Sequence, residues 1–195
     1  MLMFIQTETT HNPEVLKFIP GRDVLGAGTR EFRSVDEARA SPLAEAIFAL
    51  DGVERVFLGA DFLTVTRGED APSWPQLKAP ILAAIMEHFT SGAPTILGAE
   101  GRDDADGHDD TAYEGDAIQV VAEIKDLLDT RIRPAVAQDG GDIVFNRFDV
   151  DTGVVWLHMR GACAGCPSSA ATLKAGVENM LKHYVPEVTR VEQTL

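Results

Sequence analysis

Short apolar runs dominate the pattern of residues 1–92. The runs MFIQTE, VLKFIP, VERVFLG and DFLTVTR are rich in β-branched and aromatic side chains, a composition that predicts β-strands. The last two runs are separated by Gly-Ala-Asp at residues 59–61, so we expect them to form a β-hairpin.

Two stretches of the same segment have the apolar spacing of amphipathic helices. Ser41 is a favourable N-cap and Pro42 a favourable first helical residue, which predicts a helix from that point. A second helix is predicted over residues 74–89, where an apolar side chain recurs every four positions. The predicted buried faces consist of Leu43, Ile47 and Leu50 in the first helix and of Leu77, Ile81, Ile85 and Phe89 in the second. The predicted order is β-β-α-β-β-α, a small α/β sandwich.

Residues 117–195 combine helices and strands in another order. A helix is predicted over residues 117–136, and DGGD at 139–142 is a breaker that ends it. The strands IVFNRFDV and VVWLHMRG form a hairpin through an Asp-Thr-Gly turn, and a helix over residues 168–185 and the strand VTRVEQ follow. The predicted buried face of the first helix consists of Ile118, Val121, Ile124, Leu128 and Ile132. This order, α-β-β-α-β, makes the predicted class of the whole chain α+β, with two small α/β sandwich domains.

The two patterned segments are separated by residues 93–116, which have no apolar period. From Gly98 to Asp116 there are eight acidic residues and one basic residue, a net charge of −7. Such a stretch is either a docking tail for a basic partner or a solvated linker that repels itself, and we favour the second interpretation. The predicted domains are therefore 1–92 and 117–195, joined by an acidic flexible linker at 93–116.

The whole chain of 195 residues has 17 basic and 31 acidic side chains, a formal charge of −14. This excess disfavours contact with phosphate backbones and with anionic lipid. No apolar run approaches the roughly 20 residues of a membrane span. We therefore expect neither nucleic acid nor a membrane as a partner. The first residues, MLMFIQTETTHNP, lack the features of a targeting leader.

The two cysteines of the chain, Cys163 and Cys166, form a C-x-x-C motif between a predicted strand and a predicted helix. Flanking glycines allow a tight backbone path, and Pro167 suits the first position of the helix. Unpaired amides and the positive end of the helix dipole should lower the pKa of both thiols below about 8.5. A thiolate is both a redox nucleophile and a soft-metal ligand, so the placement alone leaves both functions open.

The number of ligands favours a metal or a cluster over a redox couple. Iron–sulfur clusters and tetrahedral zinc sites usually have four ligands, whereas one chain supplies two thiols. Two copies related by a two-fold axis would complete the set, and the five histidines show no paired spacing with the cysteines. A thiol–disulfide oxidoreductase is the alternative, although Pro167 follows the motif and the preceding hairpin argues against a βαβ unit. Asp139 and Asp142 are better explained by a turn than by a metal or acid–base role.

The residues around the motif resemble the C-terminal domain of the NifU/Nfu iron–sulfur cluster proteins. The similarity rests on G-x-C-x-x-C-P-S-S within VVWLHMRGACAGCPSSAATLKAGVENML and on the upstream QDGGDIVF. The first segment independently resembles the Nfu N-terminal domain, through MFIQTETTHNPEVLKFIPG, SPLAEAIFALDGVERVFLGADFLTVTR and a W-x-x-L-K-x-x-I helix. The two resemblances cover nearly the whole chain except the linker.

The resemblance implies a cluster scaffold or carrier, not an enzyme. Cys163 and Cys166 would bind a [4Fe–4S] cluster shared by two protomers, with [2Fe–2S] or zinc as less favoured occupants. The partners would be a second copy of the chain, upstream cluster donors and apo iron–sulfur client proteins, chosen in part by the N-terminal domain. Bacterial cytoplasm is the expected location, or the mitochondrial matrix if a leader has been removed. No G-x-S-x-G or H-E-x-x-H motif indicates catalysis.

Overall fold

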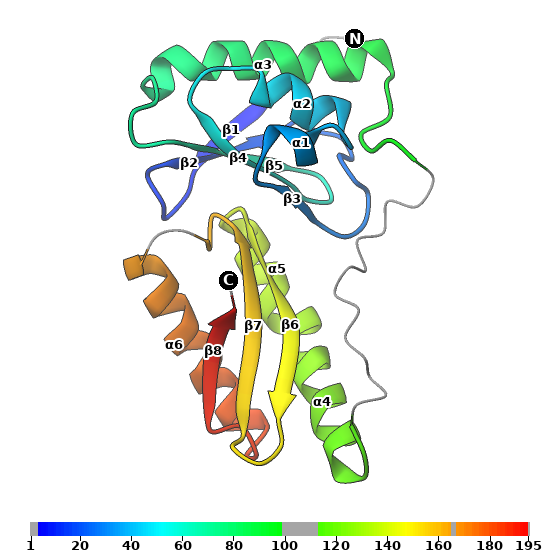
Figure 1. Cartoon of the computed structure of the whole chain (residues 1–195), viewed down its shortest axis with the longest axis vertical. Helices are drawn as coiled ribbons and strands as arrows, with labels where there is room; N and C mark the ends of the chain where they lie inside the picture. Colours follow the sequence, from blue (N-terminus) through cyan, green and yellow to red (C-terminus); the bar gives the residue numbers. More distant parts are fainter. Residues whose placement is uncertain (1–3, 99–112, 165–166, 195) are drawn as a thin grey trace. The chain divides into compact units, whose positions relative to one another are not determined.

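The computed structural model describes residues 4–98, 113–164 and 167–194, leaving aside the side chains of residues 167–170. These residues fall into two units, one on each side of residues 99–112 (Figure 1). Each unit combines helices with a β-sheet, so the predicted α+β class with two domains is confirmed. Most of the predicted linker, 93–116, lies outside the described residues, and its limits stay a prediction.

Five antiparallel strands form the sheet of the N-terminal domain, in the order β1-β2-β5-β4-β3. The strands are β1 (Gln6–Thr9), β2 (Val15–Ile19), β3 (Arg30–Phe32), β4 (Val53–Leu58) and β5 (Leu63–Arg67). The predicted hairpin is confirmed, because β4 and β5 are antiparallel neighbours in sequence and in the sheet. The sequence pattern does not predict β3, a three-residue edge strand in which Phe32 alone is buried.

Three helices cover one face of this sheet (Figure 1): α1 (Val35–Ala38), α2 (Pro42–Phe48) and α3 (Trp74–Ser91). The predicted start of α2 is confirmed, since the Ser41 hydroxyl accepts a 3.1 Å hydrogen bond from the backbone N–H of Ala44. The core contains the apolar side chains Leu43, Ile47, Leu77, Ile81 and Ile85 of the helices and Phe18, Val56, Leu58, Leu63 and Val65 of the strands. The pattern does not predict α1, a single turn whose one buried side chain is Ala38. With β3 and α1, the observed order is β-β-β-α-α-β-β-α.

His88, near the end of α3, is a buried polar side chain whose Nε2 has no hydrogen-bond partner among the described residues. It is 6% exposed, and its ring packs edge-on against Phe89 with the ring centroids 5.1 Å apart. Burial lowers the pKa of His88 below its usual value of 6.5, because it favours the neutral over the charged imidazole in the folded domain.

We expect the N-terminal domain to lose stability as the pH falls below about 6.5, because the unfolded chain then binds a proton at His88 more readily than the folded domain does. A His88→Leu protein should keep more of its pH 7 stability at pH 5 than the parent protein does. Urea denaturation followed by Trp74 fluorescence in a Trp156→Phe background measures the difference. Substitution of the exposed His11 by Gln is the control. An equal pH dependence in His88→Leu and in the parent protein would contradict the expectation.

The C-terminal domain has a three-stranded sheet, in the order β6-β7-β8. The strands are β6 (Gly141–Asp149), β7 (Val154–Gly161) and β8 (Arg190–Thr194). The predicted hairpin is confirmed by the antiparallel pairing of β6 with β7, whereas β8 pairs with β7 in parallel after helix α6 (Pro167–Tyr184). β7, α6 and β8 therefore form a βαβ unit, so the expectation that the cysteine motif lies outside such a unit is wrong. Parallel pairing requires a long crossover, and α6 supplies it.

The helix predicted over residues 117–136 is continuous but irregular. It consists of α4 (Asp116–Leu127), a π-helical turn η2 (Leu128–Ile132) and α5 (Arg133–Gln138). Pro134 explains the π turn, because proline has no N–H to donate and its ring crowds the preceding turn. The predicted buried face is confirmed for Val121, Ile124, Leu128 and Ile132. It is wrong for Ile118, which is 55% exposed, because the first turn of α4 buries Ala117 instead.

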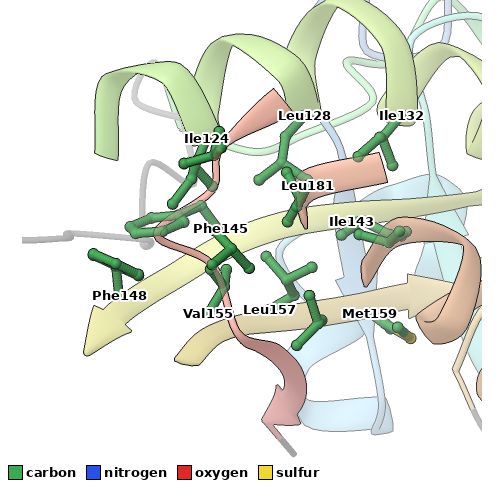
Figure 2. Packing of buried hydrophobic residues seen from close by; sticks show 14 of the residues in the cluster. Ile124, Leu128, Ile132, Ile143, Phe145, Phe148, Val155, Leu157, Met159 and Leu181 are labelled. Carbon is green, nitrogen blue, oxygen red and sulfur yellow. The ribbon is translucent and has the colours of Figure 1, made fainter. Parts of the chain in front are cut away.

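The core of the C-terminal domain lies between these helices and one face of the sheet (Figure 2). Alternate residues of β7 point into this core, as the two-residue period of a strand requires: Val155, Leu157 and Met159. They pack with apolar side chains of β6 and the helices, among them Ile143, Phe145, Ile124, Leu128, Ile132 and Leu181. Within the described ranges of the chain, no helix combines the length and the hydropathy that crossing a membrane requires.

Candidate metal centre

Cys163 lies in the turn that follows β7, at the end of the sheet where β6 begins. Two backbone hydrogen bonds hold this turn: the N–H of Ala162 donates to the Gly140 carbonyl over 3.1 Å, and that of Ala164 donates to the Gly161 carbonyl over 3.0 Å. The Cys163 side chain is 7% exposed and belongs to the core of the C-terminal domain. The first cysteine of the motif therefore has a defined place in the fold.

The DGGD segment at 139–142 shapes the space around the Cys163 sulfur. Gly140 follows the last turn of α5 with φ +81°, which confirms the predicted helix-ending glycine. Gly141 begins β6 against the thiol: a Cβ at this residue would overlap Cys163 Sγ and would lie 3.0 Å from the Arg160 carbonyl oxygen. The second glycine is therefore required by the close approach of the sulfur, a role that the turn interpretation misses. The sequence signal for this role is the pair of glycines, because one glycine alone would be enough to end the helix.

The surroundings of Cys163 differ from those predicted for a thiol at a helix N-terminus. Burial, with smaller contributions from the carboxylates of Asp139 and Asp142, raises the pKa of the Cys163 thiol to about 12. The predicted lowering of this pKa is therefore wrong for Cys163. The reason is positional, because Cys163 precedes the first residue of α6 by four positions and its side chain packs in the core. At neutral pH the cluster-free protein holds Cys163 as a protonated thiol.

Asp142, the residue that follows Gly141, is a buried carboxylate with 3% exposure. It accepts two hydrogen bonds from the Arg133 guanidinium, from Nε to Oδ1 over 2.8 Å and from Nη2 to Oδ2 over 3.0 Å. The backbone N–H of Ile143 donates a third, to Oδ1, over 2.9 Å. Hydrogen bonding to Asp142 raises the pKa of Arg133 well above its usual value. This pair joins α5 to β6 and so holds the intervening glycines in place. The sequence analysis does not predict the ion pair, because its two partners lie on different elements.

Arg133 forms ion pairs with two carboxylates at the same distance of 2.8 Å, and these should differ strongly in energy. Arg133→Met leaves the Asp142 carboxylate buried without its cation, which should cost the C-terminal domain about 3 kcal/mol of unfolding free energy. Asp129 is largely exposed, so Asp129→Asn should cost less than about 0.5 kcal/mol and serves as the matched control. Urea denaturation followed by Trp156 fluorescence in a Trp74→Phe background measures both values. Equal losses in the two proteins would contradict this assignment.

The second cysteine of the motif, Cys166, lies outside the described residues. The structure brings Cys163 together with the DGGD segment, but it places His158 of β7 on the face of the sheet opposite the buried Met159. In the parts of the chain that the structure describes, no group of three or more His, Cys, Asp or Glu side chains could hold a metal ion.

Two family models match this chain, one for each domain. The model described as "Scaffold protein Nfu/NifU N terminal" matches residues 5–92, and the model described as "NifU-like domain" matches residues 124–192. A solution structure of a NifU-like protein from Saccharomyces cerevisiae is 29% identical, covers 49% of this chain and 86% of its own, and has a TM-score of 0.44.

Curated relatives match over nearly the whole chain. "NifU-like protein 5, mitochondrial" of Arabidopsis thaliana is 52% identical over 191 residues, which are 98% of this chain and 68% of the relative. "NFU1 iron-sulfur cluster scaffold homolog, mitochondrial" of Drosophila willistoni is 52% identical over 192 residues, 98% of this chain and 63% of the relative. The chain thus spans about two thirds of the length of these relatives. With both domain models matched in sequence order and these identities, the chain belongs to the Nfu/NifU family of scaffold proteins.

Proposed function

We propose that this protein carries iron–sulfur clusters and catalyses no reaction of its own. One [4Fe–4S] cluster would be held between two copies of the chain through Cys163 and Cys166 of each copy, and then passed to an apo iron–sulfur protein. Membership of a scaffold family supports the proposal, as does a relative whose name is iron–sulfur cluster scaffold homolog. The cluster is cargo, received from an upstream donor or assembled in place.

The observation that carries the proposal is the contact between Gly141 and the Cys163 sulfur. A cysteine that merely fills the core needs apolar neighbours and nothing more. Here β6 begins with a glycine in contact with the sulfur, and an ion pair between Arg133 and the buried Asp142 holds the start of that strand in place. Such support is typical of metal ligands, whose position is set by the groups behind them.

The number of thiols supports a site shared by two chains. The chain has two cysteines, and clusters of this type are usually held by four thiolates. A two-fold axis beside the motif would bring the four together from two identical surfaces. A cluster shared in this way is open to ligand exchange from outside the dimer, which is what delivery to another protein requires.

The charges near Cys163 also suit a cluster that must be released. A cluster held by four thiolates is negatively charged, and the carboxylates of Asp139 and Asp142 lie near enough to raise the pKa of the thiol. Arg133 offsets the charge of Asp142, so the repulsion between the cluster and the carboxylates is reduced but not removed. We infer moderate retention of the cluster, as expected of a carrier.

A thiol–disulfide oxidoreductase remains the alternative function, and the βαβ unit around the motif is compatible with it. The attacking sulfur of such an enzyme must be a thiolate near neutral pH. Burial raises the pKa of Cys163 to about 12, and this opposes both functions alike, because a metal ligand must also be a thiolate. Insulin reduction in the presence of dithiothreitol distinguishes the two functions, because a carrier should give no acceleration over a Cys163→Ser/Cys166→Ser control.

The names of the relatives support a mitochondrial location, and they give no support to the bacterial cytoplasm expected from the sequence. We therefore propose the mitochondrial matrix as the compartment in which this chain works. Apo iron–sulfur proteins and cluster donors of that compartment are the proposed partners.

Cluster transfer to an apo-enzyme tests the proposed function. The protein is reconstituted anaerobically with iron and sulfide, separated from excess reagents, and mixed with an apo-enzyme whose activity requires a [4Fe–4S] cluster. We expect the enzyme to regain activity in the presence of a weak chelator, at a concentration that traps free iron but leaves the absorbance of the carrier's cluster unchanged, because the cluster passes directly between the proteins. If the chelator abolished reactivation, the protein would be releasing free iron instead of delivering a cluster.

A further inference from the structure

The two carboxylates of the DGGD segment differ in their surroundings. Asp142 is buried and accepts two hydrogen bonds from the Arg133 guanidinium, which offsets its charge. Asp139, the residue between α5 and the pair of glycines, is exposed to solvent. The charge of Asp139 therefore acts from the surface of the domain, whereas the charge of Asp142 is compensated inside it.

Asp139 lies near the Cys163 sulfur because the chain allows it little distance. Consecutive Cα atoms are about 3.8 Å apart, so the Asp139 Cα lies within about 7.6 Å of the Cα of Gly141, the residue that contacts the sulfur. The Gly140 carbonyl between them accepts a 3.1 Å hydrogen bond from the Ala162 N–H, which fixes this approach. The Asp139 carboxylate also contributes to the raised pKa of the Cys163 thiol. A negatively charged cluster at this sulfur would lie at a distance on the order of 10 Å, about one Debye length at 0.1 M salt, and would be repelled.

The position of Asp139 at the end of a helix does not favour a carboxylate. Asp139 is the C-cap of α5, which ends a continuous helical segment that begins with α4. The last carbonyl groups of a helix carry a partial negative charge, so an acidic side chain beside them is unfavourable. Gly140, with φ +81°, already supplies the helix-ending conformation. Residues that break such a local rule are concentrated at functional sites, so the charge of Asp139 is better explained by what the neighbouring thiol binds.

We propose that the charge of Asp139 speeds release of the iron–sulfur cluster, an inference that rests on the proposed carrier function. Asp139 would act by repelling the cluster, without binding iron. A two-fold axis through the cluster would bring the Asp139 side chains of both copies near it, so each chain would contribute the same repulsion. The two carboxylates would also repel each other, which favours separation of the copies once the cluster has left.

The rate of cluster loss from the reconstituted full chain tests the proposal. The visible absorbance of the cluster is followed after an excess of the strong chelator EDTA is added under anaerobic conditions. Asp139→Ser should lose its cluster about threefold or more slowly than the parent protein, and Asp139→Lys more slowly still. Asp139→Glu keeps the charge and should lose the cluster at the rate of the parent protein. Added NaCl should reduce the differences, because salt screens the repulsion.

Asp151→Ser is the matched control, since it removes the same charge from another exposed carboxylate of this domain. Asp151 lies in the turn after β6, about 25 Å from Gly141 at the start of this nine-residue strand. Its substitution should leave the rate of cluster loss unchanged. Reduction adds an electron to the cluster, so the midpoint potential of the cluster should rise in Asp139→Ser and stay the same in Asp151→Ser. Urea denaturation followed by Trp156 fluorescence in a Trp74→Phe background shows whether each variant is folded.

Three results would overturn the proposal. If the parent protein held a cluster and the Asp139→Ser and Asp151→Ser proteins lost theirs equally fast, the inference would fail while the carrier function stood. If Asp139→Glu released the cluster as slowly as Asp139→Ser, the shape of the side chain and not its charge would set the rate. A parent protein that bound no cluster at all would overturn the carrier function, and this inference with it.

Discussion

Cys163→Ser and Cys166→Ser proteins, each reconstituted anaerobically with iron and sulfide, should retain less than about a tenth of the cluster bound by the parent protein. Each substitution removes two of the four thiolates of the proposed dimer, since both copies carry it. Serine has nearly the same shape as cysteine, so the core around Cys163 should stay packed. The visible absorbance of the cluster and the iron and sulfide content per chain are the measurements.

The control for this pair is Ala175→Ser, which adds a hydroxyl at an exposed position of α6 without removing a thiol. It should bind as much cluster as the parent protein. Thermal unfolding of all three variants separates loss of a ligand from loss of the fold. If Cys163→Ser bound the cluster as well as the parent protein, Cys163 would not be a ligand and the proposed site would be wrong.

Gly141→Ala should reduce the bound cluster to about a tenth as well, although it leaves both cysteines in place. The new Cβ would overlap Cys163 Sγ and would approach two backbone atoms, the Arg160 carbonyl oxygen at 3.0 Å and the Cys163 nitrogen at 3.1 Å. Backbone atoms cannot swing aside as the end of a flexible side chain can, so the turn that holds the sulfur must shift. The strain should cost the domain about 1–3 kcal/mol, less than its whole stability.

Gly176→Ala is the matched control for the Gly141 substitution. Gly176 lies in α6 with nothing within 4 Å of an added Cβ, so alanine there should stabilise the helix by about 0.5–1 kcal/mol and leave cluster binding unchanged. Cluster absorbance after reconstitution and urea denaturation followed by Trp156 fluorescence are measured for both variants. A folded Gly141→Ala protein with full cluster content would show that the Gly141 contact does not position the ligand.

Elements whose signals lie within a few neighbouring residues could be predicted from the sequence. The capped start of α2 at Ser41 and the hairpin of β4 and β5 depend on local capping, turn residues and strand composition. β3 could not be predicted in this way, because it is a short strand with one buried side chain, Phe32. α1 does have a local signal, since Ser34 caps it and accepts a hydrogen bond from the Glu37 N–H, but its single turn is too short to show an apolar period.

The cysteines of the proposed site are evident in the sequence, whereas the environment of Cys163 is not. The sequence places two thiols before a helix, which predicts a lowered pKa from local structure alone. The raised pKa of Cys163 comes from the core that the turn packs against and from Asp139 and Asp142, which are distant in sequence. The pairing of Arg133 with Asp142 and the contact of Gly141 with the sulfur likewise depend on tertiary structure.

Native mass spectrometry of the anaerobically reconstituted full chain tests the central claim most directly, because it reports the number of chains and the metal content of one particle. We expect a species of two chains and one [4Fe–4S] cluster, which becomes a cluster-free monomer after prolonged incubation with an excess of a strong chelator. Reconstitution of the Cys163→Ser protein in parallel should give no such species. A cluster held by a single chain, or a dimer that contains zinc and no cluster, would contradict the claim.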